Sequence, residues 1–202
     1  MREVYKSKFR VKREYSSFFQ EGGEEKVYYF LKRLKLHSKE TFYHSFAVAK
    51  LAGRFGTSLG YEPKDVIRLN IAGLLHDIGK LNIPIDILHK EESLTEEEWN
   101  IMKQHVMIGY KMLQFWISDM DILLAMKQHH ERYDGTGYPN RLKEGISDFA
   151  YIIMLADVFD GLTRKRSYRT DTIAISNAKE IMLADQGHYD RYYLDIFLNE
   201  VV

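Results

Sequence analysis

The stretch that decides the fold is residues 71–80, IAGLLHDIGK. Its first five residues are apolar on almost every side, as in a helix buried among other helices. The run then continues directly into His76 and Asp77, and the interior of a protein does not tolerate such side chains without partners. A buried helix that ends in a histidine and an acid predicts a helical protein with a polar centre inside it.

The segments on either side of this stretch also follow a helical period. Three prolines occur in 202 residues, and no alternating strand pattern competes over a comparable length. Ser38 and Pro63 are typical helix-start residues, and Thr95 with Glu98 predicts a capping box. The predicted fold class is all-α, with a loop at 132–147 and helices at about 24–36, 38–59, 63–78, 95–116, 118–131, 148–166, 171–185 and 190–200.

The composition excludes several classes of protein. With 45% hydrophobic and 13% aromatic residues, the chain can bury a core, which excludes wholesale disorder. The absence of cysteine excludes disulfides, thiolate metal sites and cysteine nucleophiles. The 29 basic residues balance 29 acidic ones, which argues against a DNA or RNA polymer as partner. Without a signal peptide or an apolar run of roughly 18 residues, we expect a cytoplasmic protein that does not bind a membrane.

The N-terminal segment differs in composition from the rest of the chain. Residues 1–13 contain six Lys or Arg residues, and Gly22-Gly23 follows. We therefore expect residues 1–23 to form a basic arm or a short helix. Residues 24–202 are expected to form a single domain, because their length suits one domain.

Polar residues interrupt the apolar faces of the expected helices. An unpaired buried carboxylate costs several kcal/mol, and few Lys or Arg residues on these faces can neutralise four of them. Two or three divalent cations would do so, with imidazoles as further ligands. The sequence therefore predicts a buried metal site with several ions. The residues on these faces are Glu40, His44, His76, Asp77, His105, His129, His130, Asp157 and Asp160.

Each of these residues also has a structural explanation when it is taken alone. A histidine on an apolar face is usually satisfied by hydrogen bonds, His129-His130 suits a helix terminus, and Glu40 suits a first helical turn. Their convergence favours the metal site. The remaining histidines, His37, His89 and His188, are expected at the surface.

Histidine and carboxylate ligands without sulfur suit iron, manganese, zinc or cobalt. Asp77, next to a histidine ligand, can bridge two ions, and such a pair hydrolyses phosphate esters well. Lys80 follows one turn later and can face the same cavity, where it would hold the nucleophile or neutralise phosphoryl oxygens. The alternative for Lys80 is a surface lysine at a helix end.

Two further stretches are expected to face a substrate. Residues 129–139, HHERYDGTGYP, combine two paired histidines with glycines that permit a backbone close to a ligand. In residues 164–169, RKRSYR, guanidinium groups suit phosphate recognition, although a solvated helix end is the alternative. The expected substrate contacts are Asp134, Gly135, Gly137, Tyr138, Pro139, Asp160, Arg166 and Arg169.

Together these motifs resemble the HD-GYP family, a branch of the HD-domain metal-dependent phosphohydrolases. The resemblance rests on residues 76–80 (HDIGK), 129–139 (HHERYDGTGYP) and 156–160 (ADVFD), in a match that runs in order from about Glu40 to Arg169. It implies an all-α HD-domain helical bundle. Because 202 residues leave no room for a receiver or sensor domain, we expect a stand-alone HD-GYP domain, regulated through a homodimer, a separate regulatory protein, the N-terminal arm or metal supply.

The resemblance also implies roles for individual residues. Asp77 falls on the bridging ligand, Lys80 on the catalytic lysine, and Glu40 on the extra ligand of members that hold three metals. Two or three divalent ions, usually iron or manganese, are implied. The metal-ligand positions are Glu40, His44, His76, Asp77, His105, His129, His130 and Asp157, while Asp160, Arg166 and Arg169 fall near the substrate.

The implied reaction is hydrolysis of cyclic di-GMP to pGpG, and in some members on to GMP, by a metal-bridging hydroxide. The chain departs from common family patterns at Tyr151, Gly161 and Ser167, none of which is a ligand position. Two alternatives stay open. One is a phosphohydrolase of another nucleotide, such as a mixed cyclic dinucleotide, and the other is a non-catalytic module that senses a nucleotide or docks a signalling partner.

Overall fold

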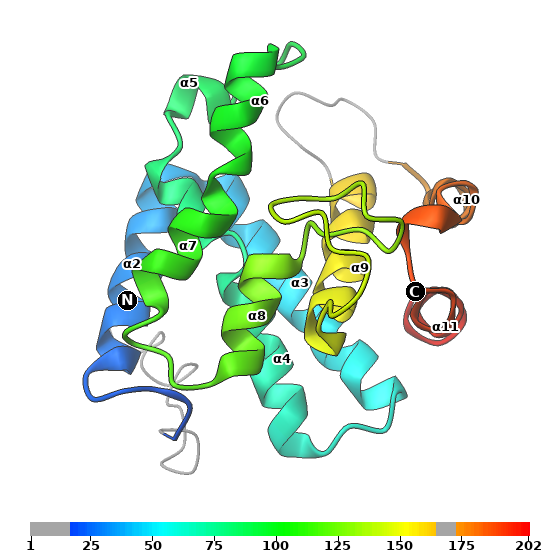
Figure 1. Ribbon diagram of the computed structural model, residues 1–202, viewed down its shortest axis with the longest axis horizontal. Helices are drawn as coiled ribbons and strands as arrows, with labels where there is room; N and C mark the ends of the chain where they lie inside the picture. Colours follow the sequence, from blue (N-terminus) through cyan, green and yellow to red (C-terminus); the bar gives the residue numbers. More distant parts are fainter. Residues whose placement is uncertain (1–16, 165–172) are drawn as a thin grey trace.

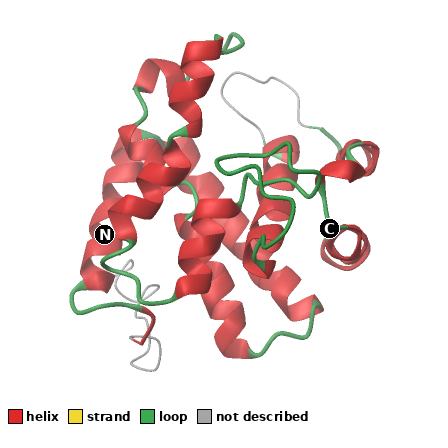
Figure 2. Ribbon diagram, viewed as in Figure 1, coloured by secondary structure: helices red, strands yellow, loops and turns green. Residues whose placement is uncertain are grey.

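The computed structural model describes residues 17–164 and 173–202, which form a bundle of helices joined by short loops (Figure 1). Within these residues there is no β-strand, only an isolated bridge between Phe19 and Ile117 (Figure 2). The all-α prediction is therefore confirmed. None of the helices in the described part of the chain has the length and apolar character that a membrane span requires.

The elements follow the expected order along the chain. They are α2 (Gly23–His37), α3 (Lys39–Ser58), α4 (Pro63–Leu75), the 3-10 turn η2 (Ile78–Asn82), α5 (Ile85–Leu88), α6 (Glu96–Lys103), α7 (His105–Leu113), α8 (Met120–Gln128), α9 (Asp148–Thr163), α10 (Ile175–Ala184), the 3-10 turn η3 (Gln186–His188), α11 (Arg191–Ile196) and the π-helical turn η4 (Phe197–Val201). The segment 1–16, which holds most of the predicted basic arm, lies outside the described residues.

Two of the predicted helix starts are confirmed by their caps. The Ser38 hydroxyl accepts a hydrogen bond from Thr41 N (3.1 Å) at the start of α3. At the start of α6, Thr95 and Glu98 form both hydrogen bonds of the capping box. The helix expected over about 118–131 begins later, at Met120, because the Asp119 carboxylate caps it and accepts from the N–H groups of Asp121 and Ile122.

Two predicted helices are shorter than expected. The helix expected over 63–78 ends at Leu75, and the chain then tightens into η2. The helix expected over 95–116 is interrupted at Gln104, so that α6 and α7 are separate elements. His76 and Asp77 therefore lie on the turn between α4 and η2, and His105 begins α7.

The hydrophobic core lies where α3 packs against α4 and α9 (Figure 1). Val48 and Phe55 of α3, Leu69 of α4, and Ile152 and Ile153 of α9 are all fully buried. Burying such side chains contributes about 1.5–3 kcal/mol each, so this contact fixes the three helices relative to one another. Ligand positions on these helices are fixed with them.

Candidate metal centre

Five parts of the bundle bring the predicted ligands together. Seven of the eight predicted ligands come from these parts: His44 from α3, His76 and Asp77 from the turn after α4, His105 from the start of α7, His129 and His130 just after α8, and Asp157 from α9. All except His130 and Asp157 are buried almost completely, with at most 6% of the residue exposed. The predicted inward placement is thus confirmed for His44, His76, His105 and His129, while His130 is half-buried.

Close packing beside Gly79 explains how the turn that carries Asp77 reaches the helix that carries His105. A Cβ atom at Gly79 would lie 1.9 Å from the His105 carbonyl oxygen and 2.6 Å from Gly109 N. No side chain can be accommodated at such distances, so glycine is required in the HDIGK stretch. This requirement is steric. The close approach that it permits brings the candidate ligands His76 and Asp77 next to His105.

Three of the histidines are oriented by the same local device. The Nδ1–H of each donates to the backbone carbonyl three residues earlier: His76 to Gly73 (2.7 Å), His105 to Met102 (2.7 Å) and His129 to Met126 (2.9 Å). Because a carbonyl can only accept, Nδ1 must carry the hydrogen, and Nε2 keeps a lone pair. This is the arrangement of metal-binding histidines, in which the second nitrogen sets the tautomer.

The lone pairs converge on buried groups that lack partners. The Nε2 atoms of His76, His105 and His129 and the Oδ1 atom of Asp77 form no hydrogen bond among the described residues. An unsatisfied buried polar group costs about 1–3 kcal/mol. The Asp77 carboxylate nevertheless lies 3.3 Å from His76 Nε2 and 3.3 Å from His105 Nε2. Acceptor atoms at this separation repel one another unless a cation lies between them.

The ligand atoms form three overlapping groups, each within 4.8 Å. The groups are Asp77 with His105, His129 and His130; Asp77 with His44 and His76; and Asp157 with His76 and His129. Asp77 belongs to two of them, as a bridging carboxylate would. This set of imidazole and carboxylate ligands fits divalent cations of the first transition row.

Burial keeps several of these imidazoles neutral. It lowers the pKa of His105 to about 4 and that of His130 to about 3, and it holds the pKa of His129 well below its usual value. Burial alone would raise the pKa of Asp77, but Lys80 and His76 outweigh it and hold that pKa well below its usual range. At neutral pH the site therefore offers neutral nitrogen lone pairs beside ionised carboxylates.

His44 is held between two carboxylates. Its Nδ1 lies 2.7 Å from Asp160 Oδ2 and its Nε2 lies 2.8 Å from Asp157 Oδ1. Burial lowers the pKa of His44, but the hydrogen bonds to Asp157 and Asp160 outweigh it and raise the pKa to about 9. Asp160 in turn accepts from Arg164 Nε (2.6 Å) and Nη2 (2.9 Å). Asp160, expected near a substrate, thus lies behind His44.

The structure corrects one step of the sequence argument, which found few basic residues near the buried acids. Arg164 neutralises Asp160, and Lys80 Nζ lies 2.6 Å from Asp77 Oδ2. Neither cation donates a hydrogen bond to the unpartnered Nε2 atoms of His76, His105 and His129. The argument for metal ions therefore rests on those lone pairs more than on the count of acids.

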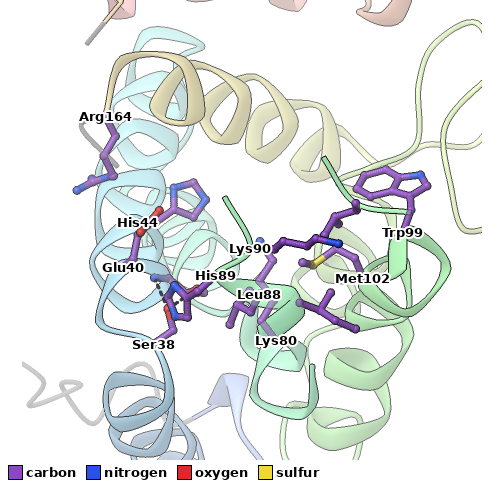
Figure 3. Close-up of a pocket in the computed structure, with 13 residues that line it drawn as sticks. Ser38, Glu40, His44, Lys80, Leu88, His89, Lys90, Trp99, Met102 and Arg164 are labelled. Atoms are coloured by element: carbon purple, nitrogen blue, oxygen red, sulfur yellow. Dashed lines mark hydrogen bonds between the residues drawn. The ribbon is translucent and has the colours of Figure 1, made fainter. Parts of the chain in front are cut away.

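A cavity of about 320 Å³ lies beside the metal centre (Figure 3). Glu40 and His44, which the sequence predicted as metal ligands, line it together with Lys80, which was expected to face the same cavity. Arg164 also lines it, and so do residues of α5, α6 and the segment between them, which the sequence analysis did not assign. His89, expected as a surface residue, is exposed and lies on the cavity wall.

The loop after His130 is folded back toward the metal centre. Tyr138 N donates to the His130 carbonyl (3.0 Å), and the Tyr138 ring stacks on the His130 ring with centroids 4.7 Å apart. A Cβ atom at Gly137 would lie 2.4 Å from the His130 carbonyl oxygen, which explains this glycine. Tyr138 therefore packs against a candidate ligand.

The other predicted contacts of this loop do not line the cavity. The Asp134 carboxylate accepts from the backbone N–H (2.9 Å) and the hydroxyl (2.7 Å) of Thr136, and Gly135 has a φ of 78° in the same turn. Pro139 follows a cis peptide bond. None of Asp134, Gly135, Gly137, Tyr138 and Pro139 is among the lining residues.

A sequence model of the HD domain matches residues 28–192. The chain belongs to the HD domain family. With the run HHERYDGTGYP at 129–139, it is an HD-GYP member of that family, as the resemblance implied.

Curated relatives of this HD domain are phosphodiesterases of cyclic dinucleotides. A cyclic di-GMP phosphodiesterase of Thermotoga maritima is 36% identical over 98% of this chain and 55% of its own length. A 3'3'-cGAMP-specific phosphodiesterase 2 of Vibrio cholerae is 35% identical over 88% of this chain and 35% of its own length. The response regulator RpfG of Xanthomonas campestris, a cyclic di-GMP phosphodiesterase, is 42% identical over 60% of this chain and 33% of its own length. The chain thus spans about half or less of the length of these relatives.

Solved structures share the fold. An HDG"Y"P protein from Bdellovibrio bacteriovorus aligns with a TM-score of 0.63 at 21% identity, over 88% of this chain and 60% of that one. The HD domain of the Listeria monocytogenes phosphodiesterase PgpH aligns with a TM-score of 0.61 at 17% identity, over 85% and 94%. At these identities the likeness establishes the HD fold alone.

Two residues near the metal centre, Glu131 and Arg164, were not assigned a role by the sequence analysis. Glu131 is fully buried and accepts from Asn140 N (2.7 Å) and Leu142 N (2.9 Å), so it holds the loop that carries Tyr138. Arg164, four residues after Asp160, could have been found from its helical spacing. The predicted phosphate contacts Arg166 and Arg169 lie outside the described residues.

Proposed function

We propose that this chain is a metal-dependent phosphodiesterase that hydrolyses cyclic di-GMP to pGpG, and on to GMP if the linear product is also a substrate. The observation that carries the proposal is the set of unpartnered Nε2 atoms around Asp77, next to a cavity lined by Lys80. The names of the curated relatives support a cyclic dinucleotide as substrate. A mixed cyclic dinucleotide is the second candidate, because relatives of 35% identity are named 3'3'-cGAMP-specific.

The metal ligands in this proposal are the residues that the sequence predicted. Seven of them converge in the structure, namely His44, His76, Asp77, His105, His129, His130 and Asp157. Glu40 lines the cavity on the same side as His44 and is proposed as a ligand of a third ion. We propose iron or manganese as the metal. When bound, such ions act as Lewis acids at phosphate oxygens and make water a better nucleophile at neutral pH.

The residues of the chain bind and orient the reacting groups. Lys80 is held by Asp77 at the cavity wall, where its ammonium group stabilises negative charge that develops on a phosphate. Asp160 and Arg164 fix the ring of His44, and backbone carbonyls fix the rings of His76, His105 and His129. Because the histidine rings are already held in place, little conformational entropy is lost when the reacting groups are brought together at the metal centre. Asp134, Gly135, Gly137, Tyr138, Pro139, Arg166 and Arg169 stay proposed substrate contacts.

We also propose that residues 24–202 act as one HD-GYP phosphohydrolase domain. Residues 1–23 would regulate it as a basic arm or short helix, together with a second copy of the chain or a separate regulatory protein. Removal of residues 1–16, followed by measurement of the oligomeric state and turnover, tests this division.

The main test is an assay of protein purified without oxygen, with metal counted per chain and products separated by chromatography. We expect two or three metal ions per chain and conversion of cyclic di-GMP to pGpG and GMP. Nucleotide binding without turnover at full metal occupancy would instead identify a sensing or adaptor module. Faster turnover of 3'3'-cGAMP than of cyclic di-GMP would favour the second candidate.

A further inference from the structure

The cavity beside the metal centre has one end whose residues have no role in the proposed chemistry. Trp99 and Met102 of α6 line this end, together with Lys90 and Leu94 of the segment before that helix. In Figure 3, Trp99 and Met102 lie on the side of the cavity away from His44 and Arg164. This end is therefore separate from the metal ligands but continuous with them through one cavity.

Trp99 offers an aromatic surface that is fixed but open. It keeps 44% of its surface exposed, although it lines the cavity. Its ring meets Tyr138 edge to face, with centroids 6.0 Å apart and planes at 78°. Tyr138 in turn stacks on His130. The Trp99 ring is thus two ring contacts away from a candidate metal ligand.

Lys90 supplies a hydrogen-bond donor at the same end. Its Nζ donates to both carboxylate oxygens of Glu98, at 2.8 and 2.6 Å. Glu98 is held by the capping box, in which it also accepts from Thr95 N (2.8 Å). Since an ammonium group has three N–H donors, this arrangement fixes the lysine next to Trp99 and leaves one donor for a ligand.

Met102 connects this wall to the metal centre. Its side chain lines the cavity, and its carbonyl accepts from His105 Nδ1 (2.7 Å). The two groups are on one residue, so the wall and the ligand histidine hold a fixed relative position. A ligand that spans both would meet a preformed surface and lose little binding energy to reorganisation.

We propose that Lys90, Trp99 and Met102 form a base-binding subsite, in which a nucleobase stacks on Trp99 and Lys90 donates to guanine O6 or N7. The inference rests on the proposed function, because the base belongs to the nucleotide whose phosphodiester lies at the metal centre. Guanine carries two acceptors on this edge, whereas adenine carries one acceptor and one donor. Lys90 therefore favours substrates that contain guanine.

Steady-state kinetics of Trp99 variants test the stacking. Base–aromatic stacking contributes equally to the ground state and the transition state, so Trp99→Ala should raise KM for cyclic di-GMP roughly ten- to hundredfold with kcat nearly unchanged. Trp99→Phe should restore most of the affinity. Trp116→Phe is the matched control, because Trp116 packs against the core and under Lys26. A KM for Trp99→Ala equal to that of the wild type would overturn the subsite.

Fluorescence gives a readout that does not depend on turnover. The chain has two tryptophans, Trp99 and Trp116. We expect the bis-phosphorothioate analogue of cyclic di-GMP to quench emission in the wild type and in Trp116→Phe, but not in Trp99→Phe. Quenching that survives in Trp99→Phe would contradict the subsite. Quenching by Trp99 without hydrolysis of cyclic di-GMP would support the subsite and refute the proposed catalytic function.

Lys90→Met tests the preference for guanine. The wild type should have a higher kcat/KM for cyclic di-GMP than for cyclic di-AMP, and the substitution should reduce this ratio roughly tenfold. Metal content should stay the same, because Lys90 is not a ligand in any of the clustered groups. An unchanged ratio would show that Lys90 does not contact the base.

Discussion

Two clusters of acidic residues in this protein solve the same electrostatic problem in different ways. In the first half of α4, Arg68 binds Asp119 through Nε (2.6 Å) and Nη2 (2.8 Å), binds Asp65 through Nη1 (2.7 Å), and also contacts Asp121. One guanidinium group thus serves three carboxylates, and all of the partners are side chains of the chain itself. This group of four residues is referred to below as the Arg68 cluster.

In the metal centre, by contrast, several buried polar atoms have no hydrogen-bond partner among the described residues. Asp77 has Lys80 on one oxygen, but its other oxygen and three histidine nitrogen atoms have no partner among the described residues. The Asp77 side chain is also deeper, with 1% exposed against 9% for Asp119. The comparison teaches that a count of acids does not identify a metal site. The distinguishing feature is a set of buried lone pairs that no donor of the chain satisfies.

The largest expected difference between the clusters is in activity. Asp77→Ala removes the carboxylate shared by two ligand groups, so we expect metal loss and a fall in kcat of at least about a hundredfold. Arg68→Met should retain both metal and turnover. Metal analysis and kinetics of the two variants check this, and full activity of Asp77→Ala would refute the role of the centre.

Metal removal should lower the thermal stability of the protein whether or not the Arg68 cluster is intact. A ligand that binds only the folded state adds about 2.7 kcal/mol at a hundred times its dissociation constant. We therefore expect chelation to lower Tm and metal addition to restore it, in the wild type and in Arg68→Met alike. A Tm that is the same with and without metal would contradict coupling between metal binding and folding.

A smaller loss of metal affinity is expected when Asp160, the hydrogen-bond partner of His44, is replaced. Asp160→Ala removes the partner of His44 Nδ1, and loss of such a partner typically costs 10- to 100-fold in metal affinity or activity. Asp160→Asn should cost less, because an amide oxygen can still accept from His44. Titration of metal into both variants measures the difference, and equal affinities of Asp160→Ala and the wild type would exclude this positioning role.

The smallest effect belongs to the Arg68 cluster. Arg68→Met should lower the free energy of unfolding at pH 7 by about 1–2 kcal/mol, because it leaves three carboxylates without their cation. Burial raises the pKa of Asp119, but the hydrogen bond from Arg68 outweighs it and holds that pKa below its usual value. Stability from this pairing is present above the unfolded pKa of about 3.9 and is lost as pH falls through the folded value. The free energies of urea unfolding of the wild type and the variant should therefore still differ at about pH 4 and converge only as the pH falls through the lowered folded pKa of Asp119.

The sequence was sufficient to predict the helices and most of the centre. Helical period and caps predicted α3 and α6, and helical period also placed His44, His105 and His129 on inward faces, where they are buried. Each of these signals is local, since it depends on residues three or four positions apart. That is why they could be read without a structure.

Other features depend on contacts between distant segments. His44 and Asp160 are 116 residues apart, so periodicity could not show that Asp160 orients a ligand. The cavity wall at Trp99 likewise arises because α6 packs near the loop of Tyr138. The break at Gln104 was missed because no proline or glycine marks it. Tertiary packing decides such features, and local sequence preference does not.

The most direct test of the central claim is anomalous X-ray scattering from crystals of the metal-loaded protein, measured on both sides of the metal absorption edge. We predict peaks within about 2.0–2.2 Å of the Nε2 atoms of His76, His105 and His129 and of an Asp77 oxygen. A map without an anomalous peak at these atoms, from protein that carries bound metal in solution, would show that the buried lone pairs serve another purpose.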